Sequence, residues 1–127
     1  MYLVVFLFCI ASLKAQDLGL LENWLRCIRD VSRLHGSYLN TIHDDEERHR
    51  RLVELNVIET CINIYKAGVV QRKRVQTKKD GGEVYPRIHA LVYDPKLGTL
   101  NKLPINFKRA MGGIKHIYDL YDEDVFH

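Results

Sequence analysis

The sequence predicts an α/β protein in which amphipathic helices are followed by a strand and a hairpin. Two segments, residues 17–35 and 44–74, carry apolar side chains three or four positions apart, the spacing of a helix with one buried face. A third segment, residues 85–103, holds a run typical of a strand and then a turn. With 127 residues, the chain forms one domain at most and can bury a small core.

Residues 44–74 organise the chain because they combine a broad apolar face with matching start and end signals. Asp44 and Asp45 suit the positive end of a helix, and Lys66 followed by Gly68 suits its end. The expected buried face is Leu52, Leu55, Ile58 and Ile62, widened by Val53, Val57, Cys61, Ile64 and Tyr65. We expect a core helix with no chemistry of its own.

Residues 17–35 predict a second amphipathic helix. Asp17 is the expected N-cap, and Gly36 is the expected stop. Its apolar face is Leu21, Trp24, Leu25, Ile28, Val31 and Leu34. The opposite side carries charges that we interpret as a solvated, ion-paired surface, namely Arg26, Arg29, Arg33, Glu22 and Asp30. Residues 37–43 link the two helices.

Charge and cysteine content exclude some classes of protein. A net charge of +3 and a pI near 8.8 are too mildly basic to indicate nucleic acid as a partner. The three cysteines, Cys9, Cys27 and Cys61, are widely spaced and form no CxxC motif. They therefore indicate neither a disulfide framework nor a zinc knuckle.

A basic cluster follows the central segment. Residues 68–76 fit either a helix end or a short strand, and a turn is expected at residues 80–82. The cluster comprises Arg72, Lys73, Arg74, Lys78 and Lys79. We interpret it as a solvated loop, with phosphate binding or nuclear targeting as the alternatives. Because no aromatic residues are interleaved with these bases, we expect no nucleic-acid partner.

Residues 85–103 predict the clearest strand. Both faces of residues 88–93 are largely apolar, with His89 as the exception, and we expect His89 and Tyr93 to be packed side chains. Residues 94–98 carry the Pro and Gly that turns require, so residues 99–103 are the expected hairpin partner. We expect residues 104–109 to be irregular and residues 112–121 to form a short helix. Residues 122–127 are the expected acidic tail.

Residues 1–15 are apolar and leave three interpretations open. The run is too short to cross a bilayer as a helix, so we expect no stable membrane span. It fits the apolar region of a secretory signal, although no Lys or Arg precedes the apolar run, as one usually does in such a signal. The alternatives are a buried strand or helix and an aberrant start joined to a truncated domain. The chain is accordingly secreted if the segment is a signal, and otherwise cytoplasmic.

The sequence contains few motifs that are typical of catalytic or binding sites. It has no glycine-rich phosphate loop and no nucleophile elbow. The histidines, at positions 35, 43, 49, 89, 116 and 127, are scattered. His49 with Glu46 and Glu47 is a candidate for weak metal binding, but a charged helix surface explains the three residues more simply.

Three blocks in order resemble the β-class carbonic anhydrases. DLGLLENWLRCIRD at residues 17–30 resembles that family's LGLxxNWLxxIRD segment, usual in its bacterial-type branch. LNVIE at residues 55–59 resembles its ELNVxEQ helix, with Thr60 where Gln is common. HALVYDPKLGTL at residues 89–100 resembles its HGWxYxxxxGxL strand and turn, with Ala90 and Leu91 departing from the Gly-Trp pair. The resemblance covers residues 16–121.

This resemblance implies a parallel α/β sheet extended by an antiparallel strand, usually in dimers or larger oligomers. It also implies zinc and the reversible hydration of carbon dioxide to bicarbonate, in which zinc lowers the pKa of a bound water. The family's ligand motifs, Cys-x-Asp-x-Arg and His-x-x-Cys-Gly-Gly, precede the LGLxxNWL segment. Residues 1–16 contain no His and no Gly, and Phe6 stands three residues before Cys9, the one candidate ligand.

We therefore assign no catalytic, cofactor-binding or metal-binding residue, and we expect no zinc on this chain. The sequence predicts the C-terminal part of a β-carbonic-anhydrase-like fold, with most of the parallel sheet missing. The expected divisions are an apolar segment at 1–15, a partial domain at 16–121 and a tail at 122–127. We expect the chain alone to be inactive and to form homo-oligomers or pair with an intact homologue. The alternative is a non-enzymatic interaction or oligomerisation module.

Overall fold

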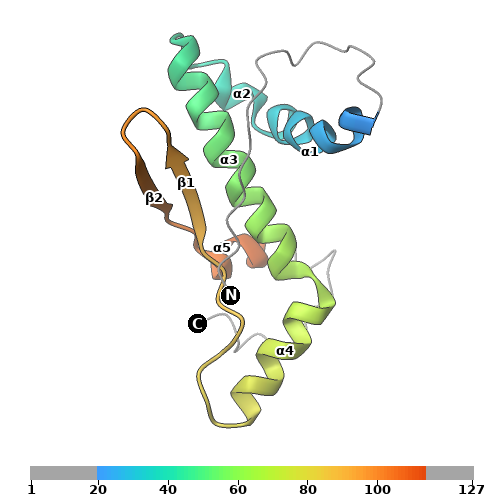
Figure 1. The fold of residues 1–127 in the computed structure, drawn as a ribbon. Helices are drawn as coiled ribbons and strands as arrows, with labels where there is room; N and C mark the ends of the chain where they lie inside the picture. The colour runs from blue at the N-terminus through green and yellow to red at the C-terminus, as the bar shows by residue number, and fades with distance from the viewer. Residues whose placement is uncertain (1–19, 114–127) are drawn as a thin grey trace.

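The fold is built along one long helix, as the computed structural model shows (Figure 1). The structure describes residues 20–113, with side chains from residue 25 onward. Its elements in order are α1 (Leu20–Leu34), α2 (Gly36–Leu39), α3 (Asp45–Lys66), α4 (Gly68–Lys79), β1 (Ala90–Asp94), β2 (Thr99–Leu103) and α5 (Phe107–Gly112). Helices α1 and α2 pack on α3, and the β1–β2 hairpin lies along the same helix (Figure 1).

Helix α3 begins and ends where its sequence signals predict. The Asp44 carboxylate caps its N-terminus by accepting a hydrogen bond from the Glu46 backbone N–H at 2.8 Å. The helix ends after Lys66 because Ala67 adopts an extended backbone, with φ −60° and ψ 127°. A new helix, α4, then starts at Gly68. Residues 68–76, which fit a helix end or a strand by sequence, are therefore helical.

Two hydrophobic clusters share α3. The helical cluster consists of Ile28, Val31, Leu39 and Leu52, with Leu25 and Leu55 packed against it. The sheet cluster consists of Val57, Cys61 and Ala90, with Ile88, Val92, Leu103, Ile105 and Phe107 packed against it. The predicted apolar face of α3 is confirmed only in part. Of its four central positions Leu52 alone is buried, while Leu55, Ile58 and Ile62 are half-buried. The other buried side chains of α3 are Asn56, Val57, Cys61 and Tyr65.

The hairpin follows its predicted turn. Strands β1 and β2 are antiparallel, with Ala90 opposite Leu103 and Tyr93 opposite Leu100. The Asp94 carboxylate accepts hydrogen bonds from the backbone N–H groups of Lys96 and Leu97, at 2.8 and 3.3 Å. Gly98 closes the turn with φ 65°, a conformation that glycine adopts without steric cost. The strand begins at Ala90, so His89 lies just before it.

Several further details differ from the sequence-based expectation. Leu34, expected on the apolar face of α1, is 61% exposed. Tyr93 is 46% exposed rather than packed. Residues 104–109 are not irregular throughout, since α5 begins at Phe107, where the Asn106 side chain accepts a hydrogen bond from the Arg109 backbone N–H at 2.9 Å. The link at residues 37–43 holds most of the short helix α2, and Gly36 opens that helix.

Some predictions fall outside the described residues. These are the Asp17 cap, the apolar segment at 1–15, the tail at 122–127 and all but the first two residues of the helix expected at 112–121. Within residues 20–113, no helix has the length and apolar character needed to cross a membrane.

Candidate functional site

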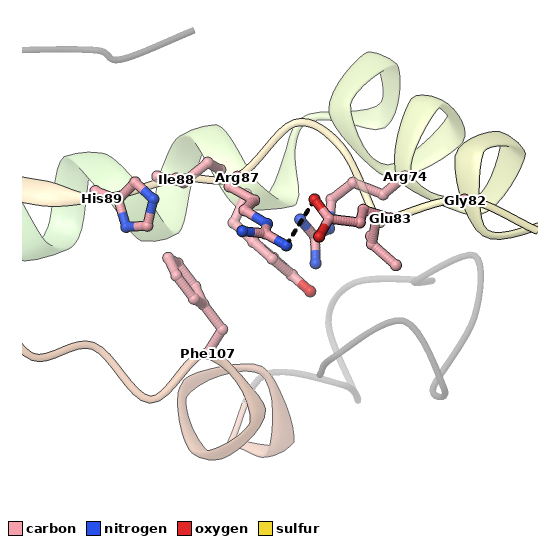
Figure 2. A pocket seen from close by; sticks show the side chains of 9 residues that line it. Arg74, Gly82, Glu83, Arg87, Ile88, His89 and Phe107 are labelled. Atoms are coloured by element: carbon pink, nitrogen blue, oxygen red, sulfur yellow. Dashed lines mark ion pairs between the residues drawn. The ribbon is translucent and has the colours of Figure 1, made fainter.

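A cavity of about 540 Å³ lies where α3, α4 and α5 meet the chain segment that leads into β1 (Figure 2). Its walls come from four parts of the fold: the end of α3, the middle of α4, residues 82–89 and the first residue of α5. The residues that line it include Tyr65, Arg74, Glu83, Arg87, Ile88, His89 and Phe107. Residues far apart in the sequence therefore share one concave surface, the usual form of a small-molecule site.

Arg74 is the buried cation of this cavity, with 6% of its surface exposed. Its guanidinium lies over the Tyr65 ring, 5.0 Å from the centroid, and its Nη1 donates a hydrogen bond to the Pro86 carbonyl oxygen at 2.6 Å. The prediction of a solvated loop is wrong here: the segment is helix α4, and its helical turn directs Arg74 inward. The other members of the basic cluster, Arg72, Lys73, Lys78 and Lys79, are exposed.

Tyr65 and Phe107 form the aromatic wall. Their rings stack with centroids 4.5 Å apart and planes at 16°. Burial raises the pKa of the Tyr65 hydroxyl, and the Arg74 charge opposes that rise only in part. The hydroxyl is therefore neutral at physiological pH. Tyr65 was expected on the core face of α3, but its contact with Arg74 was not.

At the rim, Arg87 pairs with Glu83 through an Nη2–Oε2 distance of 3.0 Å (Figure 2). The Arg87 guanidinium also lies 5.6 Å from the centroid of the Tyr85 ring. Two guanidinium groups and a single carboxylate thus line the cavity. His89, a packed strand histidine by prediction, is half-buried and stands in the cavity wall.

Gln71 supports the site from behind. It is 1% exposed, and its Nε2 donates a hydrogen bond to the Tyr65 carbonyl oxygen at 2.5 Å. That carbonyl belongs to the last turn of α3, where no further helical N–H follows in register. Gln71 therefore ties α4 to α3 across the break at Ala67. Sequence reasoning missed this residue, because Gln71 directly precedes Arg72, Lys73 and Arg74 and nothing local marks it as buried.

The described residues do not fit a zinc ion. A catalytic zinc takes three protein ligands, and no three His, Cys, Asp or Glu side chains gather anywhere within residues 20–113. Cys61 is buried in the sheet cluster, and that burial raises the pKa of its thiol. Cys27 is exposed on α1, and Cys9 lies outside the described residues.

The weaker candidate around His49 is a charged helix surface. Glu46 pairs with Lys96 of the hairpin turn, and Glu47 pairs with Arg50 one turn further along α3. Both carboxylates are thus already engaged with cations. The ion pairs of Glu46 and Glu47 agree with a charged helix surface.

Comparison with known proteins decides the family. The carbonic anhydrase family's sequence model matches residues 7–100. The chain belongs to the β-carbonic anhydrase family. It is 46% identical over 110 residues to a carbonic anhydrase of Emericella nidulans, an alignment that covers 87% of this chain and 46% of that protein. The chain therefore spans about half the length of the curated relative it matches.

This membership agrees with the architecture. The predicted fold, a partial β-carbonic anhydrase with amphipathic helices and an antiparallel hairpin, is confirmed by the family match and by the described elements. The matched range includes α1 to α4, β1 and the hairpin turn. The cavity walls from Tyr65 to His89 lie inside it, and Phe107 lies beyond it.

Proposed function

We propose that the chain supplies part of the scaffold of a β-carbonic anhydrase, whose family reaction is the reversible hydration of carbon dioxide to bicarbonate. The observation that carries this proposal is the 46% identity over 110 residues to a carbonic anhydrase. The resemblance of residues 17–30 to LGLxxNWLxxIRD favours the bacterial-type branch within the family. Zinc, when bound in this family, supplies a hydroxide nucleophile.

We propose further that this 127-residue chain does not hold that zinc by itself. The printed sequence contains neither Cys-x-Asp-x-Arg nor His-x-x-Cys-Gly-Gly. What the described residues provide is the long helix α3 with its two clusters and the hairpin beside it. We propose that these clusters hold α1, α2 and the β1–β2 hairpin on α3. No residue among them is proposed as a zinc ligand.

A second copy or an intact homologue is the proposed partner. Tyr93 and Leu100, which face each other across the hairpin, are 46% and 54% exposed, and Leu97 in the turn is 73% exposed. An exposed apolar patch of this kind favours association, because covering it removes apolar surface from water. A two-stranded sheet also leaves one backbone edge of each strand open to pairing.

Two measurements on the purified chain test the proposal: metal content by elemental analysis after dialysis, and carbon dioxide hydration by stopped flow. We expect no stoichiometric zinc and no hydration above buffer. Mixing with an intact homologue is expected to give a complex with the homologue's activity. Zinc near one per chain together with hydration would contradict the scaffold role and would make Cys9 and His89 the first residues to replace.

The remaining assignments rest on sequence alone. We propose residues 16–121 as the partial domain, preceded by the apolar segment and followed by the acidic tail. Export through residues 1–15 is the alternative to a cytoplasmic location. A reporter fused behind residue 16 distinguishes the two, because export places the reporter outside the cell and retention leaves it inside.

A further inference from the structure

The cavity has one apolar side and one cationic side. Its apolar wall is formed by the stacked rings of Tyr65 and Phe107 together with Ile88 (Figure 2). Its volume of about 540 Å³ falls within the range of about 300–1,000 Å³ that is typical of small-molecule sites. Planar apolar walls of this kind favour a ligand with an aromatic ring, which stacks on or meets them edge to face.

The cationic side consists of two guanidinium groups with different freedom. Arg74 is buried, and the Pro86 carbonyl and the Tyr65 ring hold it in place. Arg87 lies at the rim with 54% of its side chain exposed, and its partner Glu83 is 64% exposed. An exposed ion pair of this kind contributes little to stability, so its carboxylate can be replaced by another at small cost.

We propose that this cavity binds a small aromatic carboxylate. Its carboxylate takes the place of Glu83 beside Arg87 and faces the positive field of Arg74, because a guanidinium recognises a carboxylate through two parallel N–H donors. Its ring lies against Phe107 and Ile88. The lining carries two permanent cations and one anion, which favours a negatively charged ligand over a neutral one of the same shape.

This proposal is independent of zinc and of carbon dioxide hydration. Every residue that carries it lies within residues 65–107, and none is proposed as a metal ligand. An inactive, metal-free chain is therefore a suitable sample. The test succeeds or fails whatever the outcome of the metal and hydration measurements.

The experiment titrates the full-length chain with benzoate, with its neutral analogue benzamide and with inorganic phosphate, followed by amide chemical shifts in NMR. We expect saturable shifts on benzoate addition at Arg74, Arg87 and Phe107. Benzamide should bind about tenfold more weakly, the effect of losing one charge-assisted hydrogen-bonded pair. Phosphate should also bind more weakly, because it gains nothing from the aromatic wall.

Matched variants locate the site. Arg87→Gln should weaken benzoate binding about tenfold, whereas Lys73→Gln removes the same charge from an exposed position outside the cavity lining and should leave it unchanged. Glu83→Gln removes the competing carboxylate and should strengthen binding. Equal binding of benzoate and benzamide, equal loss in the Arg87 and Lys73 variants, or tighter binding of phosphate would each overturn the proposal.

Discussion

The two clusters on α3 differ in what surrounds them. The helical cluster is made of aliphatic side chains from α1, α2 and α3, and its buried members carry no polar atom on their side chains. The sheet cluster lies beside three buried polar side chains, those of Tyr65, Gln71 and Arg74. In the helical half, hydrogen bonds to α3 lie outside the buried cluster, between His35 and Glu59 and between Arg51 and Tyr38. In the other half, buried side chains themselves make directed hydrogen bonds.

The helical cluster therefore contributes mainly to stability, whereas the residues around the sheet cluster also shape a cavity. Apolar burial is non-directional, so it stabilises the packing of α1 on α3 without fixing a particular chemical group. Around the sheet cluster, the bonds from Gln71 to the Tyr65 carbonyl and from Arg74 to the Pro86 carbonyl fix the walls of a cavity. Buried polar groups are costly unless they are bonded, and here they gather beside the cavity.

The largest expected effect is the loss of stability when a side chain of the helical cluster is removed. Leu52 is 3% exposed, so Leu52→Ala leaves a void that its neighbours fill only in part. We expect a loss of about 3 kcal/mol in the free energy of unfolding, measured with urea. Val69→Ala is the control, since Val69 is 66% exposed and should change that free energy by less than about 0.5 kcal/mol. A loss in the Leu52 variant no greater than in the control would mean that this cluster does not stabilise the fold.

A smaller loss is expected at the break between α3 and α4. Gln71→Ala removes the donor to the Tyr65 carbonyl and leaves that acceptor buried, which should lower the free energy of unfolding by about 1–2 kcal/mol. Thermal or urea unfolding measures the change. Gln76→Ala, on the exposed side of α4, is the matched control and should have little effect. Equal effects of the two substitutions would contradict the conclusion that Gln71 holds α4 to α3.

Asn56 lies between the two clusters, and its replacement is expected to raise the free energy of unfolding rather than lower it. It is 1% exposed, and neither its Nδ2 nor its Oδ1 meets a hydrogen-bond partner within the part of the chain that the structure describes. Asn56→Leu keeps a similar shape and removes that desolvated amide, so we expect a gain of about 1 kcal/mol in unfolding free energy. Asn63→Leu, an exposed site on the same helix, is the control. A loss of stability in the Asn56 variant would show that the amide is bonded in solution.

The smallest effect at neutral pH concerns Tyr65 and appears only in alkaline solution. Burial raises its pKa in the folded chain above the ordinary 10.0, so the unfolded chain loses this proton first as the pH rises. The contribution of Tyr65 to the free energy of unfolding should therefore be constant below pH 10 and should fall as the pH rises from there toward the folded pKa. Tyr65→Phe should fall less steeply over the same interval in urea titrations at stepped pH. Parallel curves for the two proteins would contradict the assignment.

Regular patterns in the sequence predict the scaffold well. The apolar spacing locates α1 and α3, the two aspartates at residues 44 and 45 locate the start of α3, and the Asp-Pro-Lys-Leu-Gly run locates the hairpin turn. Each of these signals is local, because it depends on residues within a turn or two of one another. The resemblance in three short blocks also leads to the family that the comparison shows.

The cavity could not be predicted in the same way. Arg74 belongs to a cluster of five basic residues whose composition predicts a solvated segment. It is buried because Tyr65 and Pro86 contact it from other parts of the fold. Asn56 is likewise polar in sequence and buried in the fold. Such positions depend on tertiary neighbours, which hydrophobic periodicity does not record.

Because β1 and β2 pair in a fixed register, the number of residues in their turn is constrained, both in evolution and in engineering. Ala90 and Val92 face α3 opposite Leu103 and Asn101, while Tyr93 faces outward opposite Leu100. Side chains alternate along a strand, so one residue inserted between Asp94 and Thr99 would invert β2 and bring Leu100 and Lys102 toward the core. Insertions of two residues would preserve the facing. Length variation at this turn is therefore expected to occur in even steps.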